Sequence, residues 1–409
     1  MKLFVYEHVA GGGFAGQDIP SSVLCEGFGM LRALISDFKA AGHYVMTTLD
    51  VRLKGLKPPI KADTIISISS GRELNKTLER FSSFADAVYI IAPESGQVLR
   101  KLVETVREAG GVSLNCSVSA IEKASNKMSV YEAAKKAGLS VPETLIAELN
   151  ENMDKIKHAG DKLRLPLVFK PVNGVGCGGL SVVRNELQMK AAVNKIMKKS
   201  ESKQFLVQKL IDGTDVSVSL ISMGTEALPL TLNRQIMHLT SPSSDSHYLG
   251  GVVPFHHVLK NDALEAAKKL VEGFKDFRGY VGVDVVLTED GPVVMEVNPR
   301  LTTSYIGLRK VMNFNPAQAM IDAVLTRKLP ENVQVSGYTF FSKVKVSAPT
   351  SKALQETYRL EELVSPPFPF TDDGTTWALI VAYAARLRDA RTRFYKARKS
   401  LMRILLRGG

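Results

Sequence analysis

Acidic and amide side chains follow an apolar segment at two-residue spacing near position 296. Glu296, Asn298 and Arg300 come directly after Gly291–Met295, a run that is typical of a buried β-strand. Side chains two positions apart on a strand face the same side, so Glu296 and Asn298 share a face. Carboxylate and amide oxygens are the ligands that Mg²⁺ prefers. This spacing is compatible with a metal site, and a solvated strand end with an Asn-Pro turn fits these residues equally well.

A second carboxylate lies on the preceding apolar segment. Asp284 is the acidic residue of Val283–Leu287, which we expect to be a neighbouring strand. Two carboxylates and an amide on adjacent strands can hold a divalent cation together with phosphate oxygens. If a nucleotide lies nearby, Asp284, Glu296 and Asn298 would form a metal–phosphate site.

Two glycine-rich segments compete as phosphate-binding loops. Residues 11–16 match G-x-G-x-x-G, but no predicted helix opens directly after them, so a dinucleotide site is the less favoured interpretation. The second segment joins two short predicted strands, and its glycines leave backbone N–H groups accessible to phosphate. Lys170 precedes it by four residues and can add a point charge. A plain hairpin turn is the alternative. The glycines of this second loop are Gly174, Gly176, Gly178 and Gly179.

The extended segment before Asp215 can hold a nucleoside. Around Gln208, Lys209 and Ile211 the backbone can offer hydrogen-bonding groups to an adenine edge, while apolar side chains line the pocket. Asp215 can accept hydrogen bonds from ribose hydroxyls. An Asp-Gly turn between strands is common, so this segment carries little weight alone.

Length and composition favour a globular protein of several packed units. The 409 residues exceed what one core supports, and 45% hydrophobic with 23% charged residues is an ordinary globular balance. Cys25, Cys116 and Cys177 form no CxxC pair, which argues against a disulfide framework or structural zinc site. We expect a soluble, cytoplasmic protein without a transmembrane segment.

The formal net charge of +12 is concentrated near the C-terminus. Nine Lys or Arg and one Asp lie between Arg386 and Gly409. Apolar residues from Ile380 to Ile404 recur every three or four positions, which predicts a basic amphipathic helix. Packing on its own chain or a homo-oligomer contact is the favoured role. Nucleic-acid binding by this tail is the alternative from another functional class, but we expect no nucleic-acid partner.

Strand and helix signals alternate in the first 120 residues, which predicts a doubly wound α/β domain with a parallel sheet. Beyond it, an α+β pattern surrounds the glycine loop and the acidic strands. The predicted domains are residues 1–120, 121–210, 211–332 and 333–409.

In order and spacing, these motifs resemble the ATP-grasp superfamily. The matching positions are Asn126–Lys127, Lys170 before its glycine loop, Gln208–Ile211, Asp215, Asp284, Glu296, Asn298 and Arg300. The resemblance implies an ATP-grasp fold, in which an N-terminal α/β domain precedes two α+β subdomains that clasp ATP. A C-terminal extension ending in the basic helix follows.

The resemblance also implies roles for these residues. Lys127, Lys170 and the glycine loop would contact the ATP phosphates, and the metal ligands would hold two Mg²⁺ or Mn²⁺ ions. Gln208 replaces a Glu that is usual at this position, which weakens its link to the adenine amino group. Arg300 and Arg234 are catalytic candidates for binding substrate carboxylate or phosphate charge, and either can instead form a salt bridge.

A closer resemblance is to the archaeal tyramine–L-glutamate ligases of methanofuran biosynthesis. It rests on Leu3–Gly13, Leu24–Leu31 and Asn298–Ser304. It implies an amide bond between tyramine and the side-chain carboxylate of L-glutamate, formed through an acyl phosphate with release of ADP and phosphate. An ATP-grasp ligase for another amino acid or peptide is the alternative.

The residue that takes the proton of the amine stays open. Glu7, His8 and the segment His247–His257 are candidates. Aromatic residues, among them Tyr248, could form walls for an aromatic amine, but core packing is their default role.

Overall fold

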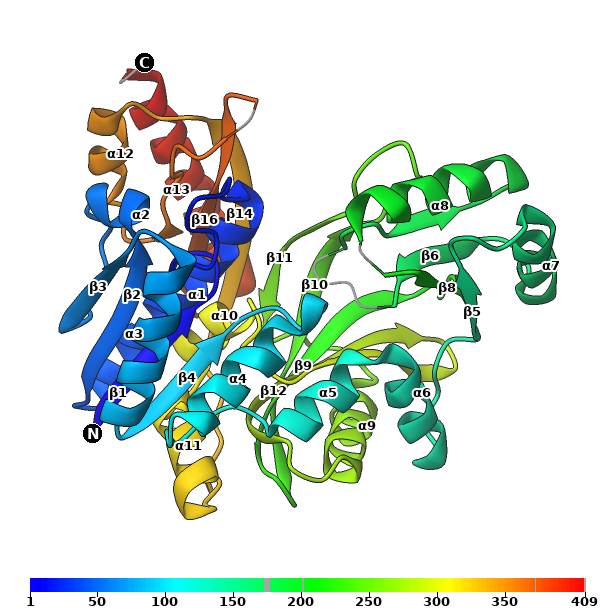
Figure 1. Ribbon diagram of the computed structural model, residues 1–409, viewed down its shortest axis with the longest axis horizontal. Helices are drawn as coiled ribbons and strands as arrows, with labels where there is room; N and C mark the ends of the chain where they lie inside the picture. Colours follow the sequence, from blue (N-terminus) through cyan, green and yellow to red (C-terminus); the bar gives the residue numbers. More distant parts are fainter. Residues whose placement is uncertain (173–176, 201, 372, 408–409) are drawn as a thin grey trace.

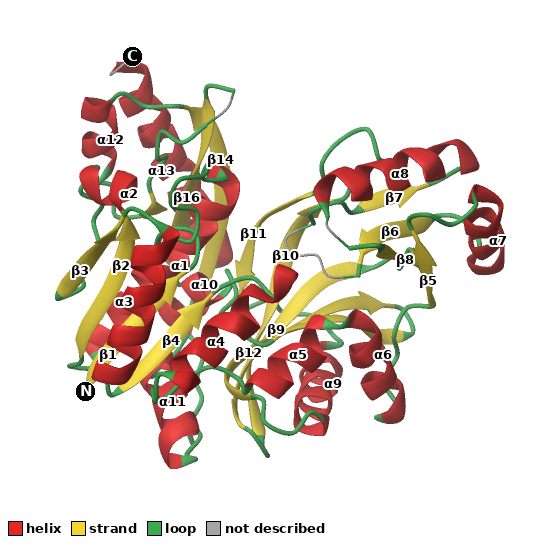
Figure 2. Cartoon of the chain, viewed as in Figure 1, coloured by secondary structure: helices red, strands yellow, loops and turns green. Residues whose placement is uncertain are grey.

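The protein has a main body and a smaller lobe (Figure 1). The computed structural model describes residues 1–172, 177–200, 202–371 and 373–407. Three sheets lie within these residues. The N-terminal sheet and a large sheet form the body, and the third sheet forms the smaller lobe, on the right in Figure 2.

The N-terminal domain is a parallel sheet with helices on both faces. Its elements are β1 (Lys2–Glu7), α1 (Ser21–Ala40), β2 (Tyr44–Asp50), α2 (Val51–Gly55), β3 (Thr64–Ile68), α3 (Gly71–Phe84), β4 (Ala87–Ile91), the 3₁₀ turn Ser95–Gln97 and α4 (Val98–Glu108). The strand order is β3–β2–β1–β4. Leu3 and Val5 of β1 share a core with α1, whereas Phe4 and Tyr6 share one with α3 and α4. This alternation confirms the doubly wound arrangement.

The smaller lobe is an antiparallel sheet packed against two helices. Its elements are β5 (Thr144–Glu148), α7 (Met153–Leu163), β6 (Leu167–Pro171), β7 (Ser181–Val183), α8 (Glu186–Lys199) and β8 (Gln204–Lys209). The strand order is β5–β8–β6–β7. Phe169 and Phe205 lie in its core with ring centroids 5.5 Å apart. The lobe therefore has a core of its own.

Two helices lead into this lobe. They are α5 (Val118–Ser125) and α6 (Lys127–Lys136). Asn126 between them is extended, and its side chain accepts hydrogen bonds from the backbone N–H groups of Met128 and Ser129. This cap starts α6 at Lys127.

The large sheet contains the acidic strands at one edge and the C-terminal strands at the other. Its strand order is β13–β12–β9–β10–β11–β14–β16–β15. The strands are β9 (Thr214–Met223), β10 (Ala227–His238), β11 (His247–Val253), β12 (Arg278–Thr288), β13 (Gly291–Asn298), β14 (Tyr338–Ser347), β15 (Leu363–Ser365) and β16 (Thr375–Ala384). The helices are α9 (Lys260–Gly273), α10 (Tyr305–Val311), α11 (Pro316–Ile321), the π-helical turn Asp322–Thr326, α12 (Ser351–Thr357) and α13 (Leu387–Arg407).

The prediction of one long helix beginning near Ile380 is wrong. Ile380 and Tyr383 lie on β16, which pairs with β14 over its whole length, and α13 begins at Leu387. Pairing with a distant strand outweighs the local spacing that suggested a helix. The rest of the apolar stripe (Ala390, Phe394, Ala397 and Leu401) is buried against β14 and β16. The helix therefore packs on its own chain. Within the described ranges, no helix combines the length and apolar content required to cross a membrane.

Replacing Phe394 tests this packing. Phe394 is 4% exposed and its ring lies 4.8 Å from that of Phe340. Phe394→Ala leaves a cavity, so we expect the free energy of unfolding to fall by about 3 kcal/mol. Tyr395→Ala, at a neighbouring side chain that is 57% exposed, should cost less than about 1 kcal/mol. Urea denaturation measures both, and equal losses would contradict burial of the stripe.

Candidate active site

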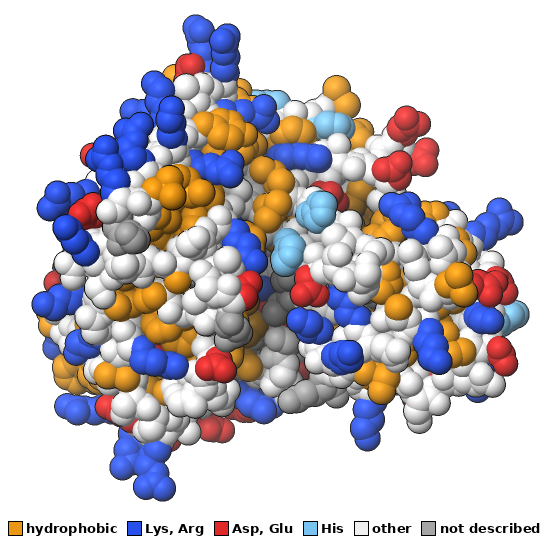
Figure 3. All heavy atoms as spheres, turned by 90° about the horizontal axis from the view of Figure 1, so that it is seen from above, with side chains coloured by type: hydrophobic (Ala, Val, Ile, Leu, Met, Phe, Trp, Pro, Cys, Tyr) orange, Lys and Arg blue, Asp and Glu red, His pale blue; other side chains and the backbone are white. Residues whose placement is uncertain are grey.

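A cavity of about 260 Å³ lies between the smaller lobe and the large sheet. In the space-filling view, a groove separates the two parts of the molecule (Figure 3). The cavity is lined by most of the predicted site residues: Lys170, Gln208, Lys209, Ile211, Asp215, Asp284, Glu296, Asn298 and Arg300. The fold therefore brings residues from both lobes to one place.

The acidic residues of this cavity face each other on the β12–β13 hairpin. Asp284 and Glu296 are cross-strand partners. Asn298 Nδ2 donates to Asp284 Oδ2 at 3.1 Å, and Gln235 Nε2 donates to Asp284 Oδ1 at 3.0 Å. Burial and the neighbouring Glu296 raise the pKa of Asp284 to about 7. A bound cation in place of the proton would stabilise the ionised form of this buried carboxyl group.

This donor set fits Mg²⁺. In the part of the chain that the structure describes, no group of three His, Cys, Asp or Glu side chains is arranged to hold a metal ion. The protein would supply two carboxylates and the amide oxygen of Asn298. Phosphate oxygens and water would occupy the remaining coordination positions of the ion, as is usual for Mg²⁺ sites that act on phosphates.

Lys127 lies directly beside the acidic pair. Its Nζ is 3.1 Å from Glu296 Oε1, and the side chain is 7% exposed. It borders a small adjoining cavity together with Glu94 and Glu296 and does not line the main one. Burial acts to lower the pKa of Lys127, but the interactions with Glu296, Tyr131 and Glu94 together outweigh it and raise the pKa. Lys127 therefore stays charged and balances the acidic hairpin.

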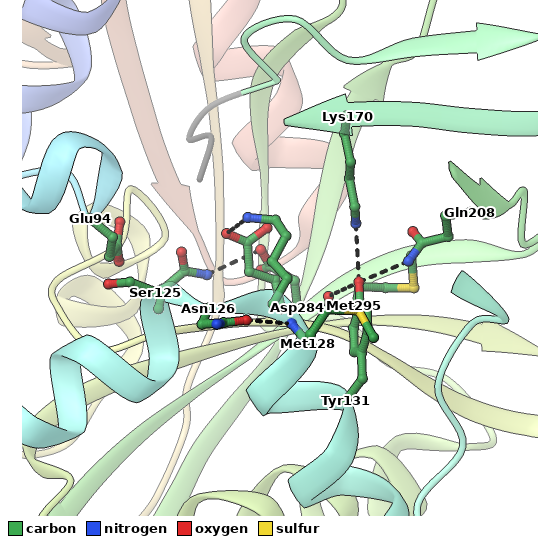
Figure 4. Close-up of polar contacts among 12 residues, drawn as sticks. Glu94, Ser125, Asn126, Met128, Tyr131, Lys170, Gln208, Asp284 and Met295 are labelled. Atoms are coloured by element: carbon green, nitrogen blue, oxygen red, sulfur yellow. Dashed lines mark hydrogen bonds and ion pairs between the residues drawn. The ribbon is translucent and has the colours of Figure 1, made fainter. Parts of the chain in front are cut away.

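Tyr131 joins the smaller lobe to the acidic hairpin, although the sequence did not single it out. Its hydroxyl accepts from Lys170 Nζ at 3.2 Å and Gln208 Nε2 at 2.8 Å, and donates to the carbonyl of Met295 at 3.2 Å. Figure 4 shows Lys170 and Gln208 pointing toward this hydroxyl from the smaller lobe. Tyr131 follows Lys127 by one helical turn on α6, so both face the site. The four-residue spacing from Lys127 is the feature of the sequence that could have identified Tyr131 as a site residue.

Gln208 presents a buried acceptor without a partner. Its Nε2 donates to Tyr131 and, at 2.8 Å, to Thr144 Oγ1. Because the Tyr131 hydroxyl uses its one hydrogen on Met295, Gln208 must turn its amide nitrogen toward it. The opposite atom, Gln208 Oε1, is buried and has no hydrogen-bond partner among the residues that the structure describes. Burying an unpaired acceptor is costly, so this atom is suited to receive a ligand N–H, such as that of an adenine amino group.

Arg300 enters the cavity next to the acidic hairpin. Its Nε donates to the Glu94 carboxylate at 2.9 Å, and Nη2 lies 3.5 Å from Asn298 Oδ1. Nη1 donates to the carbonyl of Leu301 at 3.1 Å. Each terminal nitrogen carries a second hydrogen, so Arg300 keeps donors for an anionic ligand.

Arg234 is placed differently from Arg300. Its Nη1 lies 3.4 Å from the backbone oxygen of Asp215, and its guanidinium lies 5.8 Å from the ring centroid of Phe255. It is absent from the cavity wall formed by the described residues. Asp215 itself does line the cavity, and burial raises the pKa of its carboxyl group. A catalytic role for Arg234 stays a prediction.

The two glycine-rich loops lie in different places. Gly174 and Gly176 fall outside the described residues. Gly178 and Gly179 form a turn before β7, Gly179 with a φ of +74°, and neighbouring Cys177 lines the cavity. The loop at residues 11–16 packs within the N-terminal domain, where a Cβ on Gly11 would lie 2.3 Å from the Glu7 carbonyl oxygen.

Replacing Asp284 tests its raised pKa. Between the ordinary value of 3.8 and about 7, the folded metal-free protein holds a proton that the unfolded chain releases. The free energy of unfolding should therefore fall as the pH rises through this window. Asp284→Asn, which cannot titrate, should show a flatter profile in urea denaturation with EDTA. Superimposable profiles would contradict the raised pKa.

Comparisons with known proteins agree with this geometry. Residues 124–304 match the ATP-grasp domain family, and residues 43–121 match the pre ATP-grasp 3 domain. Two relatives named tyramine–L-glutamate ligase come from Methanocaldococcus jannaschii and Methanocaldococcus fervens. The first is 30% identical over 252 residues, covering 60% of this chain and 66% of the relative. The second is 29% identical over 229 residues, covering 55% and 62%. The matches thus span less than two thirds of either relative.

Solved structures show the same fold. Biotin carboxylase from Campylobacter jejuni, in a β-γ-ATP complex, has a TM-score of 0.70 at 17% identity, covering 97% of this chain and 90% of that one. N5-carboxyaminoimidazole synthase from Aspergillus clavatus, solved with ADP, has a TM-score of 0.69 at 18% identity, covering 98% of both chains. An ATP-grasp protein from Archaeoglobus fulgidus has a TM-score of 0.60 at 22% identity, covering 93% and 99%. With its cavity between a small antiparallel sheet and an acidic hairpin, this chain has the ATP-grasp fold and contains an ATP-grasp domain over residues 124–304.

Proposed function

We propose that the protein is an ATP-dependent carboxylate–amine ligase that forms an amide through an acyl phosphate. The observation that carries the proposal is the shared cavity, in which Asp284 and Glu296 lie across from Lys170 and the unpaired acceptor of Gln208. One end suits a divalent cation with phosphates, and the other suits a base with an exocyclic amine. The two relatives named as ligases support this class of reaction.

In this proposal ATP lies along the cavity from the smaller lobe to the acidic hairpin. The backbone from Lys209 to Ile211 and the side chain of Gln208 hold adenine, and Asp215 accepts from the ribose. Lys170 binds the phosphates, together with the glycine loop from 174 to 179, part of which lies outside the described residues. Lys127, paired with Glu296, contributes positive charge beside them.

Asp284, Glu296 and Asn298 would hold Mg²⁺ or Mn²⁺, two ions in our proposal, which neutralise charge on the β- and γ-phosphates. Arg300 binds the substrate carboxylate through its remaining donors, so that the carboxylate oxygen is directed at the γ-phosphorus. The bond between the γ-phosphorus and the bridging oxygen breaks, which releases ADP and leaves an acyl phosphate. The neutral amine then attacks the acyl carbon, phosphate departs and the nitrogen loses a proton.

For the substrates, we propose the side-chain carboxylate of L-glutamate and the amine of tyramine. The support is the activity for which the two relatives are named. An ATP-grasp ligase for another amino acid or peptide is the second candidate. The basic helix α13 supports nucleic-acid binding less well, since its apolar face is buried on its own chain.

A substrate panel tests the reaction class. The full chain is incubated with ATP, Mg²⁺ and L-glutamate, and ADP formation is followed with tyramine, with other amines and with no amine. We expect ADP formation to require both a carboxylate and an amine and to be fastest with tyramine. Mass spectrometry should find the amide in equal amount. No ADP formation with any pair, together with salt-sensitive DNA binding, would overturn the ligase proposal.

Removing one carboxylate tests the metal-binding residues. Glu296→Gln should lower the rate of ADP formation by about 100-fold or more, because a neutral amide cannot balance a divalent cation. The amide oxygen can still accept from Lys127, so the melting temperature should change little. Glu265→Gln, at an exposed position on α9, removes the same charge and serves as the control. Full activity in Glu296→Gln would exclude Glu296 from the site.

A further inference from the structure

Glu26 reaches the cavity from the N-terminal domain, although it belongs to neither the acidic hairpin nor the smaller lobe. It lies on α1 and forms part of the same cavity wall. Its Oε1 is 2.5 Å from Lys343 Nζ, and its Oε2 accepts from Thr303 Oγ1 at 2.7 Å. Two distant segments of the chain therefore hold this carboxylate in place.

Lys343 is the buried partner of this carboxylate. Its side chain is 5% exposed, donates to Ser22 Oγ at 2.9 Å and lies 5.5 Å from the ring centroid of Trp377. The Glu26 side chain is 21% exposed by comparison. The cation is thus enclosed by protein, whereas the carboxylate keeps a surface toward the cavity.

Glu26 retains capacity for another donor. A carboxylate offers about four acceptor positions, and Lys343 and Thr303 occupy one on each oxygen. The remaining positions can accept N–H groups from a ligand in the cavity. An ammonium group is the favoured donor, because it carries three N–H groups and the opposite charge.

Tyr248 provides an aromatic surface in the same cavity. It lies on β11 and is half-buried. Its hydroxyl has no hydrogen-bond partner among the described residues. Burial raises the pKa of Tyr248, and the nearby carboxylates of Glu26 and Asp284 add to this effect. Tyr248 therefore lies within electrostatic reach of both Glu26 and the acidic hairpin.

We propose that Glu26 binds the ammonium group of the amine substrate, with the ring of Tyr248 against its apolar part. This inference rests on the proposed ligase function and assigns the specificity for the amine to a carboxylate outside the metal site. The bound substrate class is a primary amine carrying an apolar or aromatic group. Lys343 and Thr303 orient Glu26 for this contact.

The test compares tyramine with 2-(4-hydroxyphenyl)ethanol, which has the same ring but a neutral hydroxyl in place of the ammonium. Isothermal titration calorimetry with the full chain, ADP and Mg²⁺ measures binding without turnover. We expect the wild type to bind tyramine about tenfold or more tightly than the alcohol, because a charge-assisted hydrogen bond contributes that much to affinity. Glu26→Gln should reduce this preference to about twofold or less, and Glu26→Asp should largely keep it.

A matched variant separates recognition from a structural role. Lys343→Gln removes the positive charge of this ion pair, but its amide N–H can still donate to Glu26 and hold the carboxylate in place, so this variant should keep the preference for tyramine. If Glu26 only joined distant segments of the chain, Glu26→Gln and Lys343→Gln would both lower the stability. Their effects on the preference for tyramine would then be equal, whether both variants keep it or both lose it. Glu265→Gln controls for the loss of one negative charge. Circular dichroism confirms that each variant is folded.

Three results with tyramine would overturn the inference. They are absence of tyramine binding to the wild type, an unchanged preference in folded Glu26→Gln, and an equal loss of preference in Lys343→Gln. If Glu26→Gln weakened the binding of L-glutamate but not that of tyramine, Glu26 would belong to the L-glutamate site, and the inference would also be rejected. If the proposed ligase function itself is wrong, the wild type will form no ADP in the substrate panel, and this result is distinct from the binding results.

Discussion

The close approach of two carboxylates on one hairpin is the constraint around which the site is arranged. Asp284 and Glu296 face each other across β12 and β13, where their charges repel. The protein offsets this repulsion from several directions, with Lys127 against Glu296 and amide donors against Asp284. Without a bound cation, the pair is stabilised by neighbours that a metal–phosphate complex would have to displace or share.

The same arrangement connects the two lobes. Tyr131 accepts hydrogen bonds from Lys170 and Gln208 of the smaller lobe and donates to the backbone of β13. Lys170 and Gln208 are residues that we assign to nucleotide binding, and the Met295 carbonyl lies next to Glu296. These hydrogen bonds link the smaller lobe to the acidic hairpin through one hydroxyl group.

Local patterns in the sequence were sufficient for the alternation of strands and helices in the N-terminal domain and for placing Asp284 and Glu296 on neighbouring strands. They failed at Ile380, where spacing typical of a helix belongs to a strand whose partner, β14, lies far away in sequence. Glu26 and Lys343 could not be paired from the sequence either, because 317 positions separate them. Local periodicity carries no information about such contacts, which depend on how the sheets join.

The position of β14 and β16 in the large sheet gives the C-terminal segment a further consequence. β14 pairs with β11, so these strands extend the sheet that carries the acidic hairpin. If they were removed, β11 would become an open edge with unpaired N–H and C=O groups, a template for association between chains. The C-terminal segment is therefore not an interchangeable module. An evolutionary loss or exchange of this segment would have to provide another strand, or another cover, for the same edge.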